Sequence, residues 1–64
     1  MNDMMKLWAS MSVENLTPTY VKDINARPLI EMALCMAMRE KDAQLLRAIV
    51  ISKEAQEEAR DSII

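Results

Sequence analysis

Apolar residues recur along the chain at the spacing of a helix rather than of a strand. In the first twelve residues they lie three and four apart, which places them on one face of a helix. Asn2 precedes them and is a suitable N-cap. The pattern predicts a short helix over residues 2–12, whose apolar face must rest on other protein because so short a segment is unstable alone. The residues of this face are Met4, Leu7, Trp8 and Met11.

Two prolines indicate where further helices begin. Thr17 can cap a helix, and Pro18 suits the first helical position, where the backbone N–H has no helical partner. We therefore expect a short helix from Thr17–Pro18 to Ile24. Pro28 disfavours helical backbone at the residue before it. The sequence thus predicts a corner, followed by a second helix that starts at Pro28 and runs to about Lys41.

The helix after Pro28 is apolar on nearly every side. Glu31 is the single charged residue in residues 29–38. A helix of this kind is either central in a large core or covered by other chains. A chain of 64 residues has too little other material to cover it on all sides. We therefore expect this helix to form a core that is shared with another protein molecule.

A charged break at residues 39–42 separates this helix from a third one. Asp42 is a suitable N-cap, and we expect the third helix over residues 43–61. Its first half is dense in apolar residues and its second half is polar. The two main helices, about 28–41 and 43–61, predict an antiparallel αα-hairpin with the short N-terminal helices packed across it. A narrow stripe suited to close helix approach consists of Ala48, Ile51, Ala55 and Ala59.

The composition favours an all-α fold. Hydrophobic residues make up 52% of the chain and glycine is absent. The favoured hairpin turns of β-sheets usually need glycine, whereas Ala, Leu, Met, Glu and Lys are strong helix formers. So apolar a chain is also unlike a disordered one. We expect one all-α domain, a small helical bundle that spans residues 1–64.

A domain this small needs a source of stability besides its own core, because it buries only about 60% of the surface that its unfolded chain exposes. The single cysteine cannot form an intrachain disulfide, and the absence of histidine excludes the common zinc sites. Association with protein is the remaining source. We expect a homo-oligomer, most simply a dimer, or a complex with a larger protein.

The compartment is inferred from what the sequence lacks. The unpaired Cys35 fits a reducing environment. No stretch reaches the roughly 20 apolar residues of a membrane span, and no signal peptide is visible. We therefore expect a cytoplasmic protein, or one in the host cytoplasm if the source is viral.

Groupings of residues that carry out catalysis are absent from the sequence. Without histidine there is no Ser–His or Cys–His pair. We expect Cys35, between two apolar neighbours, to be a small buried core residue. We predict no catalytic residue, no metal, no cofactor and no small-molecule substrate, and hence a protein that is not an enzyme. One carboxylate cluster is expected to be a solvated helix face, and it consists of Glu54, Glu57, Glu58 and Asp61.

The seven methionines and the single tryptophan indicate a contact surface. Methionine is flexible and is over-used on surfaces that adapt to partners, and tryptophan is enriched at interface hot spots. The same residues also suit an ordinary small core, and both interpretations hold if a partner completes that core. The predicted partner interface consists of Met4, Leu7, Trp8, Met11, Leu29, Ile30, Met32, Met36 and Met38.

These features together predict a non-catalytic protein–protein interaction module. It would be a small accessory or inhibitory protein that self-associates or docks on a larger protein to modulate it. Very small helical chains of this kind are often phage-encoded inhibitors or bacterial regulators, so a phage protein is one expectation. One alternative is a dimeric helical DNA-binding regulator, although the net charge of −2 disfavours phosphate binding. Its densest basic group would be Arg39, Lys41 and Arg47. Another alternative is a small structural subunit of a larger assembly, such as a virus particle.

Overall fold

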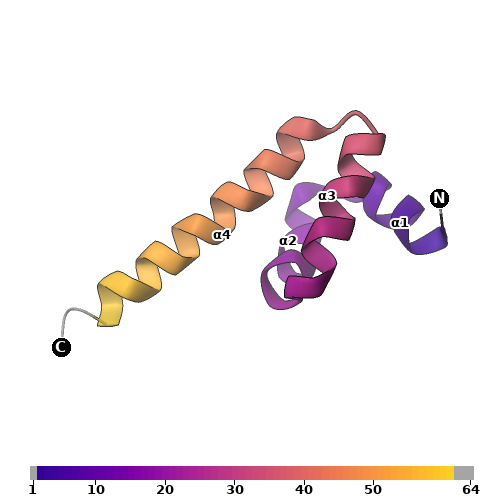
Figure 1. Ribbon diagram of the computed structural model, residues 1–64. Helices are drawn as coiled ribbons and strands as arrows, with labels where there is room; N and C mark the ends of the chain where they lie inside the picture. Colours follow the sequence, from indigo (N-terminus) through magenta and orange to yellow (C-terminus); the bar gives the residue numbers. More distant parts are fainter. Residues whose placement is uncertain (1, 62–64) are drawn as a thin grey trace.

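The predicted all-α class is confirmed. The computed structural model describes residues 2–61, the last of them by its backbone alone. Within this range the chain forms four α-helices and one 3₁₀ turn, and no strand (Figure 1). These elements are α1 (Asp3–Ser10), α2 (Val13–Lys22), η1 (Ile24–Ala26), α3 (Arg27–Met36) and α4 (Glu40–Asp61).

Helix α1 forms where the sequence predicts it. The Asn2 side chain accepts a hydrogen bond from the backbone N–H of Met5 at 2.8 Å and so caps the helix. Met5 is the buried residue of this helix, while Trp8 and Met11 are half-buried and pack against the core. The helix is therefore held by tertiary contacts, as its length requires.

Helix α2 starts earlier than predicted, so the expected start at Thr17–Pro18 is wrong. Ser12 is the N-cap, and its Oγ accepts from the N–H of Asn15 at 3.2 Å. Pro18 therefore lies inside the helix, where it cannot donate to the carbonyl of Glu14. Both Pro18 and Glu14 are exposed, so water can bind that carbonyl and the proline is tolerated.

The corner predicted before Pro28 lies at residues 23–26, but Arg27 is helical and is the first residue of α3, so the expected start at Pro28 is wrong. The helix that follows is also shorter than expected. The Asp23 side chain accepts two backbone N–H groups and opens η1. Pro28 then lies in the first turn of α3, where its missing donor costs nothing. The helix ends at Met36 instead of near Lys41.

Helix α3 ends in a Schellman motif. The N–H of Arg39 donates to the carbonyl of Leu34 at 2.7 Å, and the N–H of Met38 donates to that of Cys35 at 3.0 Å. Met38 has φ 60°, in the left-handed region that glycine usually occupies at this position. Since the chain has no glycine, a methionine takes the position at a cost of about 1–2 kcal/mol.

The core lies where α2, α3 and the first half of α4 meet, and α1 packs against α3. Burying one large aliphatic side chain contributes about 1.5–3 kcal/mol. The completely buried large side chains of the core are Leu16, Ile30, Leu34 and Leu46. Because these side chains come from α2, α3 and α4, the burial joins helices that are distant in sequence.

The αα-hairpin is shorter than predicted, because only part of α4 packs against α3. Helix α4 begins at Glu40, ahead of the predicted N-cap Asp42. Its contacts with the core are made by Ala43, Leu46 and Val50. Residues 51–60 are all exposed, and this half projects past the other helices (Figure 1). The molecule is consequently elongated, with extents of 47 × 19 × 16 Å.

The strained turn gives a stability prediction. Met38→Gly should raise the free energy of unfolding by about 0.5–1.5 kcal/mol, because glycine adopts the left-handed conformation without a Cβ clash. Urea denaturation followed by circular dichroism measures the change. Ala37→Gly is the matched control and should not stabilise, since Ala37 has φ −88°. An unchanged free energy of unfolding for Met38→Gly would contradict the strain that we assign to the Met38 backbone.

Candidate interaction surface

Helix α3 has a buried side and an exposed side, and both are apolar. Ile30 and Leu34 point into the core and are completely buried. At 3.6 residues per turn, Leu29, Met32 and Met36 lie on the opposite side. There the exposed fractions are 46%, 53% and 57%, respectively. The chain thus covers one side of this helix and leaves the other in solvent.

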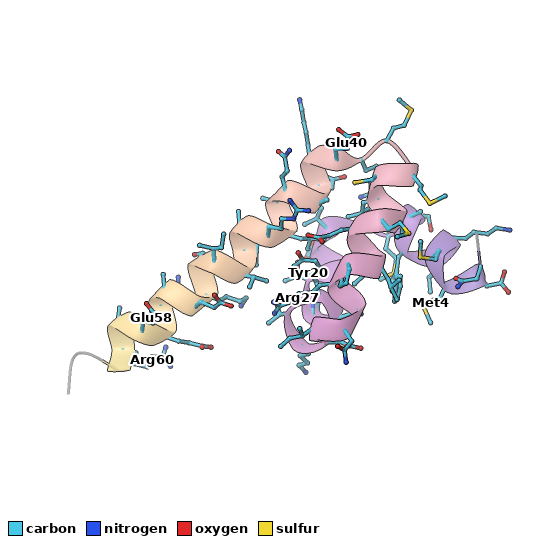
Figure 2. All side chains as sticks on the ribbon, viewed as in Figure 1. Met4, Tyr20, Arg27, Glu40, Glu58 and Arg60 are labelled. Atoms are coloured by element: carbon cyan, nitrogen blue, oxygen red, sulfur yellow. The ribbon has the colours of Figure 1, made fainter. Side chains whose placement is uncertain are left out.

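Helix α1 extends this exposed surface. Met4 and Leu7 are 52% and 54% exposed, on a helix that packs directly against α3. Figure 2 shows sulfur-bearing side chains projecting from both helices, with Met4 at the side of α1. We call this surface the methionine face. It consists of Met4, Leu7, Leu29, Met32 and Met36.

The structure places the other predicted interface residues elsewhere. Ile30 has no exposed surface, so it is a core residue and does not belong to the face. Trp8 and Met11 lie partly under the surface, packed on the core. Met38 is 91% exposed, but it lies in the turn after α3.

Cys35 is exposed, so the prediction of a buried core cysteine is wrong. It follows the buried Leu34 by one residue, which turns it about 100° away from the core. The two charged residues one helical turn away, Glu31 and Arg39, are bonded to other groups. The apolar pattern of this helix gives no signal of which side is exposed, so the position of Cys35 follows only from the tertiary structure.

Arg39 holds α1 in place. Its Nη1 donates to the carbonyls of Ala9 at 2.9 Å and Met11 at 2.7 Å, and its Nε donates to Asp42 at 2.9 Å. The last carbonyls of a helix lack helical partners and favour a nearby cation. Arg39 therefore closes the end of α1 and positions the part of the methionine face that lies on this helix.

Arg27 acts in the same way on α2. Its Nε and Nη2 donate to the carbonyls of Tyr20 at 2.7 Å and Val21 at 3.0 Å. The guanidinium also lies 5.5 Å from the centre of the Tyr20 ring, within cation–π range. The first residue of α3 is thereby fixed to the last turn of α2.

Glu31 joins three helices. Its Oε1 accepts from the Tyr20 hydroxyl of α2 at 2.9 Å and from Nε of Arg47 of α4. The Arg47 hydrogen bond, with a smaller contribution from Tyr20, lowers the pKa of the Glu31 carboxyl despite its partial burial. Burial and the neighbouring carboxylate raise the pKa of Tyr20. Glu31, one of the two charged residues of α3, therefore has a structural role.

The described residues 2–61 contain no cavity and no group of three potential metal ligands. Glu54, Glu57 and Glu58 are exposed on the projecting half of α4, and the side chain of Asp61 lies outside the described part. Three of the eight basic residues make internal contacts: Arg27, Arg39 and Arg47. The methionine face holds five of the nine exposed large apolar side chains of the described residues and is therefore the candidate site.

Comparisons with known proteins found no matching family model, no matching curated protein and no matching solved structure. Among the described helices, none is both long enough and apolar enough to cross a membrane.

The Arg39 contacts give a prediction about α1. Arg39→Met should lower the free energy of unfolding by about 2–3 kcal/mol, because it leaves two helix-end carbonyls and Asp42 without their charged donor. Urea denaturation followed by Trp8 fluorescence should shift to lower urea. Arg60→Met, on the exposed half of α4, is the control and should have little effect. Equal stability of the two variants would show that Arg39 does not hold α1.

The lowered Glu31 pKa predicts a pH effect. Because the folded-state pKa lies below the unfolded-state value, the stabilisation is present above the usual carboxyl range, about pH 4, and is lost as pH falls through the folded-state pKa. Glu31→Gln should therefore flatten the acid side of the stability curve. Urea denaturation at a series of pH values measures this. Glu54→Gln, remote from the network, should keep the wild-type profile, and identical profiles for all three proteins would contradict the assignment.

Proposed function

We propose that this protein is a non-catalytic protein–protein interaction module that binds another protein through the methionine face. The observation that carries the proposal is the concentration of five large, half-exposed apolar side chains on two adjacent helices. Contiguous apolar patches on small proteins mark interaction sites more often than single exposed residues do.

The chemistry of the face suits an adaptable contact. Three of its five side chains are unbranched methionines, which can change conformation to fit different partner surfaces. None of the five is charged, so a partner can cover them without the cost of burying an ion. The partner should therefore present a mainly apolar surface, such as one side of an amphipathic helix, with polar groups at its rim.

The energy available is modest. Each side chain is already about half buried, so covering the remainder contributes on the order of 1 kcal/mol per residue. Five residues thus contribute on the order of 5 kcal/mol, against an association cost of similar size or larger. Polar contacts at the rim must add to this apolar contribution. Binding of this kind suits a small accessory or inhibitory protein that modulates a larger one.

A cytoplasmic location is part of the same proposal. Cys35 is an exposed free thiol on the outer side of α3, and such a thiol persists in a reducing compartment. We therefore place the interaction in the cytoplasm.

The test is a comparison of two variants that gain the same charge. Met32→Lys introduces an ammonium at the middle of the methionine face, whereas Thr19→Lys places it on the exposed surface of α2. Each protein is immobilised, and the host proteins that it retains are quantified. We expect immobilised Met32→Lys to retain at least about tenfold less of the specifically bound partner than the wild-type protein retains.

Thr19→Lys is the control in this experiment. Thr19→Lys should retain the partner at the wild-type level, and circular dichroism should show both variants folded. Equal retention by Met32→Lys and Thr19→Lys would show that the methionine face is not the binding surface.

A further inference from the structure

Helix α4 has a second apolar side, which faces away from the core. Ala43, Leu46 and Val50 make its core contacts, and the same row continues as Lys53 and Glu57, which are exposed. The apolar residues of the second half therefore lie on the other side of the helix. We call this side the outer band, and it consists of Leu45, Ala48, Ile51 and Ala55.

The outer band is exposed in this chain. Leu45 is 49% and Ile51 is 66% exposed. Ala48, between them, and Ala55, one turn after Ile51, are also exposed. The projecting half of α4 is exposed over residues 51–60, and a helical segment of about three turns is marginal in stability by itself. A packing partner along this side would explain why the helix continues for 22 residues.

We propose that the outer band pairs with the same band of a second copy of this chain, with the two α4 helices antiparallel. Ile51 lies near the middle of α4 (Glu40–Asp61). A two-fold axis beside Ile51 therefore aligns the helices over their whole length, about 33 Å. The contact is isologous and closes at two subunits. The remaining helices pack on the opposite side of α4, so the two cores do not collide.

The charges beside the band favour this orientation. Arg47 lies at the edge of the band in the first half of α4, and its side chain is 60% exposed while its Nε donates to Glu31. With the axis at Ile51, Arg47 lies opposite Ala55 of the second copy, between the exposed Glu54 and Glu58. In a parallel pair the two-fold axis runs along the helices, so Arg47 of one copy and Glu54 and Glu58 of the other lie at opposite edges of the contact. Opposite charges therefore meet only in the antiparallel dimer.

The dimer surface and the methionine face are separate, so the inference goes beyond the proposed function and does not depend on it. Each copy keeps its own methionine face on α1 and α3. A dimer would consequently present two such faces, and a partner with two binding sites would be bound with higher avidity.

Sedimentation equilibrium and thermal denaturation of the full chain test the proposal. Between about 10 μM and 1 mM, the mass should approach twice 7.3 kDa and the melting temperature should rise with concentration. Ile51→Lys should raise the dimer Kd at least about tenfold while Trp8 fluorescence shows an intact fold. Met32→Lys, on the methionine face, should leave the Kd unchanged.

Two neighbouring glutamates provide the matched test of the charges. Glu58→Lys places a like charge near Arg47 of the second copy and should weaken the dimer. Glu57→Lys makes the same charge change on the side of α4 that faces away from the second copy, and it should leave the dimer Kd unchanged.

The orientation is tested by cross-linking in a Cys35→Ser background. Ile51→Cys, beside the axis, should form a disulfide between the copies. Ala55→Cys should not, because about 12 Å along the helix separates the two thiols of an antiparallel pair. Efficient cross-linking through Ala55→Cys would show a parallel pair instead.

Two results would overturn the proposal. One is a folded monomer at every concentration. The other is a dimer that survives Ile51→Lys but is lost in Met32→Lys, which would place self-association on the methionine face. Neither result depends on whether host proteins are retained, so failure of the dimer is distinguishable from failure of the proposed function.

Discussion

The Glu31 carboxylate decides how the apolar helix is oriented. Helix α3 could bury almost any of its sides, so hydrophobic burial alone does not select one of them. Glu31 accepts hydrogen bonds from Tyr20 of α2 and Arg47 of α4, and these bonds form in only one rotation of α3 about its axis. That rotation buries Ile30 and leaves Met32 exposed. This partly exposed polar contact is therefore made with Ile30 inside the core and Met32 outside it.

The arginine contacts then build the rest of the molecule on this orientation. Arg27 and Arg39 lie at the two ends of α3, and each donates to the final carbonyls of an earlier helix. Both satisfy acceptors that a short helix leaves open. Helix α1 is thus fixed beside the exposed side of α3, which joins Met4 and Leu7 to the methionine face. The chain makes these connections through side chains, since it has neither a disulfide nor long helices in its N-terminal part.

The two surfaces left open have different characters. The methionine face is built from flexible side chains on two helices, which suits a partner of variable shape. The outer band of α4 lies on a single helix, with small residues and flanking charges, which suits one partner at one register. A small chain that divides its apolar residues among a core and two surfaces keeps only a small core of its own. This division explains why so apolar a sequence encloses so few buried side chains.

Much of the fold could be predicted from the sequence, because local signals determine it. The absence of glycine and the apolar spacing predict helices, Asn2 caps the first of them, and Pro28 lies in the first turn of α3. The same signals misplaced the start of α2, because Thr17–Pro18 has the features of a helix start while Ser12 is the actual cap. Two caps competed locally, and the packing of Leu16 and Tyr20 into the core favours the longer helix.

The amino-acid pattern alone establishes that the helix after Pro28 carries more apolar surface than its chain can cover. Which side of that helix is exposed depends on the fold. The spacing of apolar residues identifies a buried side only when the opposite side is polar, and both sides of α3 are apolar. The contacts of Glu31 with Tyr20 and Arg47 supply that distinction, and they join residues 11 and 16 positions apart in the chain.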